Sequence, residues 1–225
     1  MTVSASPTAA PVAAQIKITE IFLSIQGEGL TAGVPTVFVR LTGCPLRCTY
    51  CDTAYAFSGG EYQTVPQILD RVRAFQTRHV CVTGGEPLAQ AGALNLMRAL
   101  CDAGLAVSLE TSGALDVAAV DPRVVRVLDL KTPSSGECAR NLYANLEHLR
   151  PGDQVKFVLV DRADYDWAVA TAAQYDIASR ACVLFSPAWG QLDAAALAEW
   201  MLADHLPYRL QLQLHKILWG EAPGR

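Results

Sequence analysis

Three cysteines, Cys44, Cys48 and Cys51, lie on one short segment directly after the apolar run Thr36–Leu41. Thiolates on so short a segment can converge on a single metal centre. A structural zinc ion needs four closed ligands, and the sequence offers no second C-x-x-C or H-x-H pair. A [4Fe–4S] cluster also takes thiolate ligands, and three cysteines leave one iron open to bind another molecule. From the cysteines alone, a cluster, a zinc knuckle and three unrelated thiols all remain open.

The composition favours one intracellular globular domain. The chain has 225 residues, of which 51% are hydrophobic and 18% are charged, and its net charge is -4. This length supports a real hydrophobic core, and the acidic balance gives no basic footprint for nucleic acid. We find no apolar run of about 18 residues and no secretory signal, so we expect no membrane span. Seven cysteines, three of them clustered, indicate reduced thiols and a cytoplasmic location.

Strands and helices are expected to alternate along most of the chain. The strands are short, continuous apolar runs, as a parallel sheet covered by helices requires. They are expected at 16–25, 36–41, 79–83, 105–109, 124–130, 155–160, 182–185 and 209–214. Helices are expected at 64–78, 91–103, 141–149, 164–175 and 193–203.

This alternation predicts an α/β fold. Units of about 30 residues give roughly seven strand–helix units after residue 15. A closed eight-unit barrel usually needs about 250 residues, so we expect an incomplete, open (β/α) barrel with a parallel sheet, formed by residues 16–225 as a single domain. Residues 1–15 are small, uncharged and interrupted by proline, and are expected to be a disordered leader.

Polar and glycine-rich segments follow the expected strands. Ligands of parallel α/β folds bind at the carboxyl ends of the strands. The segments that should therefore face one cavity are the cysteine loop, Gly84–Glu86, Glu110–Ser112, Lys131–Ser135 and Ser186.

Two features have more than one interpretation. By itself, the loop Gln26–Gly29 is more readily an ordinary turn than a ligand-binding loop, although its glycines would allow close approach of a ligand. Arg40 lies in an apolar strand and should not be left unpaired. It could pair with a structural carboxylate or bind a carboxylate ligand through two hydrogen bonds.

Two motifs together resemble the radical SAM superfamily. Gly43, the three cysteines and Tyr50 match its cysteine loop, and Thr83–Pro87 matches its second, glycine-rich motif. More specifically, the chain resembles the 7-carboxy-7-deazaguanine synthase family from Ile16 to the C-terminus. The runs that carry this resemblance are Phe22–Gly29, Phe38–Cys44, Cys51–Thr53 and His215–Gly220, and Ser-Ile-Gln-Gly-Glu-Gly is the most discriminating of them.

The resemblance implies a chemistry. This family converts 6-carboxy-5,6,7,8-tetrahydropterin to 7-carboxy-7-deazaguanine with loss of ammonia, a step of 7-deazapurine and queuosine biosynthesis. It uses a [4Fe–4S] cluster, S-adenosylmethionine (SAM) and Mg²⁺. SAM bound to the open iron accepts one electron and yields a radical that abstracts hydrogen from the substrate. An electron donor such as flavodoxin or ferredoxin and a homodimer are also implied.

The resemblance also assigns residues. It makes Cys44, Cys48 and Cys51 the cluster ligands and Thr53 the Mg²⁺ ligand. Together with the chemistry of the loops, it gives the SAM site as Tyr50, Asp52, Gly84, Gly85, Glu86, Ser112, Ser134 and Ser186, with Glu86 as partner of the SAM ammonium. It gives the substrate site as Ile25, Gln26, Gly27, Arg40, Thr83, His215 and the carboxylate of Arg225.

Two alternatives differ in class. A radical SAM activating enzyme would act on a partner protein and would lack the Gln26–Gly29 loop and the site at Thr53. A non-catalytic iron–sulfur or zinc module would not need the glycine-rich strand end at Gly84–Glu86.

Overall fold

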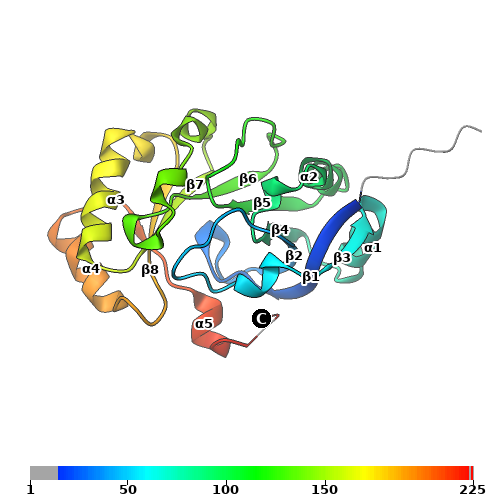
Figure 1. Cartoon of the computed structure of the whole chain (residues 1–225), viewed down its shortest axis with the longest axis horizontal. Helices are drawn as coiled ribbons and strands as arrows, with labels where there is room; N and C mark the ends of the chain where they lie inside the picture. The colour runs from blue at the N-terminus through cyan, green and yellow to red at the C-terminus, as the bar shows by residue number, and fades with distance from the viewer. Residues whose placement is uncertain (1–14, 223, 225) are drawn as a thin grey trace, which may run out of the picture.

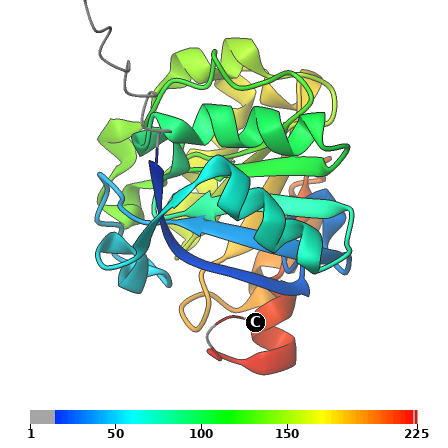
Figure 2. The ribbon, with the colours of Figure 1, turned by 90° about the vertical axis from the view of Figure 1, so that its right-hand side faces the viewer.

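A computed structural model describes residues 15–222 and 224, whose strands form one curved, open sheet (Figures 1 and 2). The strand order is β3-β1-β2-β4-β5-β6-β7-β8-β9. The strands are β1 (Gln15–Ile25), β2 (Pro35–Leu41), β3 (Glu61–Thr64), β4 (His79–Gly84), β5 (Ala106–Thr111), β6 (Val125–Asp129), β7 (Gln154–Leu159), β8 (Cys182–Pro187) and β9 (Arg209–Leu210). Among these strands β3 and β9 are the unpaired edges, so the barrel is open, as the sequence predicts.

The sheet is parallel from β2 to β9, but β1 pairs antiparallel with both β2 and β3. The all-parallel expectation is therefore corrected at this edge, and β3 is a strand that the sequence did not predict. The antiparallel direction has a consequence for function, because the Gln26–Gly29 loop leaves β1 at the edge opposite to the one where the parallel strands end.

Four helices cover the convex side of the sheet (Figures 1 and 2). They are α1 (Val65–Ala74), α2 (Gly92–Asp102), α3 (Arg162–Gln174) and α4 (Ala194–Ala203), and a short α5 (Leu214–Trp219) follows β9. The buried residues of the four helices pack on the apolar strands to form the core, for example Ile68, Leu96, Tyr165 and Leu197. Burial of this apolar surface is the main force that holds the helices to the sheet.

Local signals set the helix ends. Thr64 and Gln67 form a reciprocal capping box at the start of α1, with Pro66 in its first turn. The helix ends at Ala74, earlier than expected, and Gln76 takes a positive φ of 53° before β4 begins. Gly104, with φ 80°, follows α2 as the expected terminating glycine.

Two expected elements differ in the structure. The segment 141–149 is not an α-helix but a 3₁₀ stretch over Tyr143–His148, because the Asn145 side chain is turned inwards to bond the loop after β5. The last strand covers only Arg209–Leu210, and His215, expected on that strand, lies in α5.

The expected leader falls mostly outside the described residues. Gln15, its last residue, is already the first residue of β1. In the part of the chain that the structure describes, no helix is both long and apolar enough to cross a bilayer.

Candidate active site

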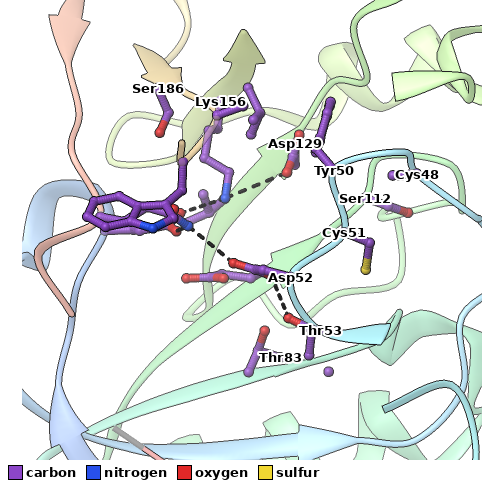
Figure 3. Close-up of a pocket in the computed structure, with 18 of the residues that line it drawn as sticks. Cys48, Tyr50, Cys51, Asp52, Thr53, Thr83, Ser112, Asp129, Lys156 and Ser186 are labelled. Atoms are coloured by element: carbon purple, nitrogen blue, oxygen red, sulfur yellow. Dashed lines mark hydrogen bonds and ion pairs between the residues drawn. The ribbon is translucent and has the colours of Figure 1, made fainter. Parts of the chain in front are cut away.

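The polar ends of the strands surround one cavity of about 460 Å³ (Figure 3). It lies inside the curved sheet, where the cysteine loop, β4, β5 and β8 meet segments from both ends of the chain. The predicted site residues that line it are Ile25, Gln26, Arg40, Cys44, Cys48, Tyr50, Cys51, Asp52, Thr53, Thr83, Gly84, Gly85, Ser112, Ser186 and His215. The convergence expected at the carboxyl edge of the sheet is thus present.

The cysteine loop is held by a second loop, which follows β6. The Thr49 backbone N–H donates to the Ser135 carbonyl at 3.1 Å, and the Thr49 hydroxyl donates to the Ser134 carbonyl at 2.7 Å. The backbone N–H of Arg47 donates to the Glu137 carboxylate at 2.5 Å. These contacts fix the loop while leaving its thiols on the cavity side.

The three thiols meet the requirements of an iron–sulfur cluster. Cys44, Cys48 and Cys51 are unpaired and half-buried, and they are the cysteines among the described residues that line the cavity. Burial raises the pKa of Cys48 to about 11 and also raises that of Cys44, so metal binding is what would hold them as thiolates. Within residues 15–222 and 224, no three His, Cys, Asp or Glu side chains converge as tightly as one metal ion requires. Three thiols suit a four-iron cluster with one open iron better than a structural zinc ion, which needs four closed ligands.

Gly84 and Gly85 allow β4 to approach the start of the cysteine loop. The Gly85 N–H donates to the Leu41 carbonyl at 3.1 Å. A Cβ atom on Gly85 would lie 2.3 Å from the Gly43 carbonyl oxygen, and one on Gly84 would lie 2.3 Å from that of Leu41. Only glycine fits at either position, and the backbone here is left open towards the cavity.

Glu86, expected at the SAM ammonium, does not line the cavity. Its side chain is fully buried, and its carboxylate accepts hydrogen bonds from the backbone N–H groups of Leu88 and Ser112 and from the hydroxyls of Thr111 and Ser112. The carboxylate is therefore saturated by the protein. It braces the end of β4 against the end of β5, and the Ser112 hydroxyl, although it lines the cavity, already has its proton directed to Glu86.

Two further predicted residues, Ser134 and Gly27, are not in the cavity wall. The Ser134 N–H donates to Asp164 and its carbonyl accepts from Thr49, which turns this residue towards the loops. Gly27 lies behind His215, because a Cβ on Gly27 would come 2.0 Å from the His215 Nδ1 atom. Arg225 lies outside the described residues.

The loop after β1 and the segment after β9 meet beside the cavity. The Leu214 N–H donates to the Gly27 carbonyl at 3.0 Å, and the Gly29 N–H donates to the Gln211 side chain at 2.6 Å. These contacts bring the Gln26–Gly29 loop under the cavity from the amino edge of the sheet and place His215 of α5 beside it. Gln26 and Glu28 therefore form part of the cavity wall, and the ligand-binding interpretation of this loop stays a prediction.

A buried charge network forms the floor of the cavity (Figure 3). Lys131 and Lys156 could be expected from the sequence to serve a ligand or to form structural ion pairs, but their partners could not be predicted. The Lys156 Nζ atom lies 2.7 Å from the Glu28 carboxylate and 3.6 Å from Asp129, and Lys131 lies 3.0 Å from the same Asp129 oxygen. Burial by itself would raise the pKa of Glu28, but Lys156 lowers it below its ordinary value. Burial raises the pKa of Glu110, which faces this network. The sequence feature that could have indicated this network is the presence of charged residues at the ends of apolar strands.

Asp52 and Thr53 form a polar corner beside the cysteine loop. The Thr53 hydroxyl donates to Asp52 at 2.7 Å, and the Gln213 side-chain amide donates to the other Asp52 oxygen at 3.3 Å. Thr53 and Asp52 thus supply oxygen atoms, the ligand type that Mg²⁺ prefers.

Arg40 reaches the cavity from β2 and is paired on one side only. Its Nε atom donates to Glu20 at 2.7 Å. The structural carboxylate that one interpretation expected is Glu20, and because Arg40 also lines the cavity, the binding of a carboxylate ligand stays a prediction.

Comparison with known proteins agrees with this geometry. Residues 38–130 match the model of the radical SAM superfamily. The chain is 48% identical to the 7-carboxy-7-deazaguanine synthase of Chlorobaculum tepidum, over 92% of this chain and 96% of that protein, and 40% identical to that of Koribacter versatilis, over 91% and 97%. It is also similar to the crystal structure of QueE from Escherichia coli, with a TM-score of 0.75 and 25% identity over 89% of this chain and 95% of that one. The chain belongs to the 7-carboxy-7-deazaguanine synthase family of the radical SAM superfamily.

Proposed function

We propose that this protein is a 7-carboxy-7-deazaguanine synthase that converts 6-carboxy-5,6,7,8-tetrahydropterin to 7-carboxy-7-deazaguanine and releases ammonia. One observation supports this proposal most strongly: three free thiols, a glycine-rich strand end and an arginine with one hydrogen-bond partner line the same cavity. The identity to relatives of that name extends over nearly the whole chain.

Cys44, Cys48 and Cys51 are proposed to hold a [4Fe–4S] cluster. When bound, the cluster and SAM supply the electron and the radical that start the reaction. The chain itself provides a half-buried loop for the cluster and a cavity that limits the access of water.

The SAM site is proposed to lie between the cysteine loop and the ends of β4, β5 and β8. The Gly84–Gly85 backbone can approach the amino-acid part of SAM without a clash from a side chain. Tyr50, Asp52 and Ser186 are the further candidates in the cavity wall. Glu86 and Ser112 are proposed to shape this wall, and Ser134 to support the cysteine loop.

Replacement of Gly85 by alanine tests this placement. The added methyl group would overlap the Gly43 carbonyl and the Cys44 Cβ. We expect SAM to bind about tenfold more weakly, equivalent to about 1.4 kcal/mol, in equilibrium binding to the reconstituted protein. Gly33→Ala is the control for backbone strain without steric overlap, because alanine is strained at the Gly33 φ of 90° although no atom lies within 4 Å of the place that its methyl group would take. Equal loss in both variants would contradict the role of close approach.

The pterin is proposed to bind at the opposite side of the cavity. Arg40 would pair with its 6-carboxylate, while Gln26, Thr83 and His215 would contact the ring. Ile25 and Gly27 would support this contact, and Thr53 would bind Mg²⁺ together with oxygen atoms of the substrate. The carboxylate of Arg225 remains a further candidate for the substrate.

Loss of ammonia requires a proton for the leaving nitrogen. Two buried groups at the floor can hold one, the Lys156 Nζ and the Glu110 carboxyl, whose pKa is raised by burial. Both line the cavity. We propose that the Glu110 carboxyl gives its proton to the leaving nitrogen and becomes a carboxylate, while Lys156, kept charged by Glu28 and Asp129, donates a hydrogen bond in the cavity.

The proposal includes features beyond the site. We propose that residues 16–225 act as one domain, that the protein works in the cytoplasm as a homodimer, and that a carrier such as flavodoxin or ferredoxin reduces the cluster. No nucleic acid or membrane takes part in the proposed reaction.

The test uses anaerobically reconstituted protein with dithionite, SAM, Mg²⁺ and 6-carboxytetrahydropterin. We expect many turnovers to 7-carboxy-7-deazaguanine, identified by its absorbance and mass. Arg40→Ala should lower kcat/KM about a hundredfold, because two charge-assisted hydrogen bonds are lost. Arg98→Ala, at an exposed position of α2, is the control. SAM cleavage without this product would overturn the substrate and favour an activating enzyme.

A further inference from the structure

The protein holds the Arg40 guanidinium from several sides. Its Nε donates to Glu20 Oε1 at 2.7 Å, and the same oxygen accepts a hydrogen bond from the Tyr55 hydroxyl at 2.7 Å. The guanidinium carbon lies 5.8 Å from the ring centre of Tyr55 and 6.0 Å from that of Phe22. The Arg40 side chain is 15% exposed and that of Glu20 24%, so this cluster is screened only in part by water.

A β-bulge brings Glu20 to Arg40. The pairing of β1 with β2 shifts register between Ile18 and Glu20, after which Glu20 lies directly opposite Arg40. Phe22 then lies opposite Phe38, and the two rings stack at 5.1 Å. Because alternate residues of a strand face the same side, Glu20 and Phe22 lie on one face of β1 beside Arg40, and of these three residues Phe22 and Arg40 line the cavity.

Tyr55 ties this cluster to the cysteine loop. It lies in the 3₁₀ helix over Ala54–Phe57, directly after the proposed Mg²⁺ ligand Thr53 and the last cysteine, Cys51. The hydrogen bond from Tyr55 to Glu20 therefore connects β1 with the segment that carries the cluster and metal residues.

The hydrogen bond from Arg40 to Glu20 limits how a ligand carboxylate can bind the Arg40 guanidinium. A guanidinium can bind a carboxylate side-on, through Nε and one terminal nitrogen, or end-on, through both terminal nitrogens. Glu20 occupies Nε, and among the described residues neither terminal nitrogen of Arg40 has a hydrogen-bond partner. A ligand carboxylate in the cavity must therefore be bound end-on.

We propose that Glu20, fixed by Tyr55, is a positioning residue that orients Arg40 for end-on binding of a carboxylate, and that this pair makes the site select carboxylated over uncharged pterins. The proposal rests on the proposed function only for the identity of the ligand. It assigns to Glu20 and Tyr55 a role that requires no contact with the substrate.

The two possible effects of Glu20, orientation of Arg40 and repulsion of the ligand, predict opposite changes in affinity for the variant Glu20→Ala. The Glu20 carboxylate repels a ligand carboxylate, so if charge alone mattered, Glu20→Ala would tighten binding. If orientation matters, Glu20→Ala leaves the Arg40 side chain mobile. Binding then weakens, because fixing a mobile side chain on the ligand costs conformational entropy. Glu20→Gln keeps an acceptor oxygen for Nε and should rescue binding.

The experiment measures the fluorescence of 6-carboxypterin, and separately of pterin, on titration with reconstituted protein containing SAM and Mg²⁺ but no reductant. For 6-carboxypterin we expect the Kd to rise about tenfold in Glu20→Ala and about threefold in Tyr55→Phe, as for loss of a charged and a neutral hydrogen bond. Glu20→Gln should stay near the wild-type Kd, and pterin should bind all variants alike. In turnover, Glu20→Ala should raise KM and leave kcat nearly unchanged.

Two controls match these variants. Glu61→Ala and Tyr62→Phe replace the same residue types on β3, where both side chains are exposed and neither lines the cavity. Both should bind 6-carboxypterin as the wild-type protein does.

Two results would overturn the proposal. One is an unchanged or lower Kd for 6-carboxypterin in Glu20→Ala, and the other is an equal loss of affinity for pterin and 6-carboxypterin, which would indicate general damage to the cavity. Failure of the proposed function would look different, since the wild-type protein would then make no 7-carboxy-7-deazaguanine from 6-carboxytetrahydropterin.

Discussion

Replacement of Cys48 by alanine is expected to abolish product formation and SAM cleavage together. Cys48 is one of three unpaired thiols at the cavity, and a cluster that loses one of three protein ligands is not held at the site. The fold should survive, because the cysteine loop keeps the hydrogen bonds of Thr49 and Arg47 to the loop after β6. Iron content and the visible absorbance of the reconstituted protein measure the cluster directly.

Cys182→Ala is the matched control for this experiment. Cys182 is also an unpaired, half-buried thiol, but it begins β8 and does not line the cavity. Its variant should keep full iron content and activity. Normal iron content in Cys48→Ala, or equal iron loss in both variants, would contradict the assignment of the cluster to this loop.

Replacement of Asp153 by alanine is expected to produce the largest loss of stability. Asp153 and Arg126 form a pair whose side chains are 5% and 1% exposed, with Oδ2 and Nη1 3.4 Å apart. The Asp153 carboxylate also accepts the backbone N–H groups of Arg126 at 2.8 Å and Arg150 at 2.9 Å. Its removal leaves a buried guanidinium without a counter-charge, bonded only to the carbonyls of His148 and Val120, and the free energy of unfolding should fall by about 3–5 kcal/mol.

An exposed ion pair provides the control for this measurement. Asp166 pairs with Arg162 at 2.8 Å on α3, where the side chains are 59% and 49% exposed. Asp166→Ala should cost less than about 1 kcal/mol, because water screens the pair. Anaerobic urea unfolding of both variants gives the comparison. Similar midpoints for Asp153→Ala and the wild-type protein would show that the buried pair contributes little.

Local features of the sequence determined the cysteine loop, the helix ends and most strands. Three thiols on a short segment can be read without the fold, since the segment itself keeps them close. The capping box at Thr64 and Gln67 and the terminating Gly104 are likewise interactions between near neighbours. The continuous apolar runs of β2 and β4 predicted parallel buried strands, because both of their faces are covered.

The same local evidence placed some residues wrongly in space. Gly84 and Gly85 lie at the cavity edge as expected, but strand geometry alone did not say that the Glu86 side chain turns away from the cavity to Ser112. The strand expected over 209–214 ends at Leu210 and α5 begins at Leu214, because the chain leaves the sheet after Leu210 to meet Gly27. Propensity over so few residues is weak compared with such tertiary contacts.

What only the tertiary structure decided is which distant residues meet. Glu28 and Lys156 are 128 positions apart, and their pairing depends on the antiparallel direction of β1 and on the relative positions of β1 and β7 in the sheet. The pairing of Glu20 with Arg40 depends on a single register shift. The sequence alone required that buried charges find partners, since an unpaired buried charge is costly. The identity of each partner was set by the packing of the sheet.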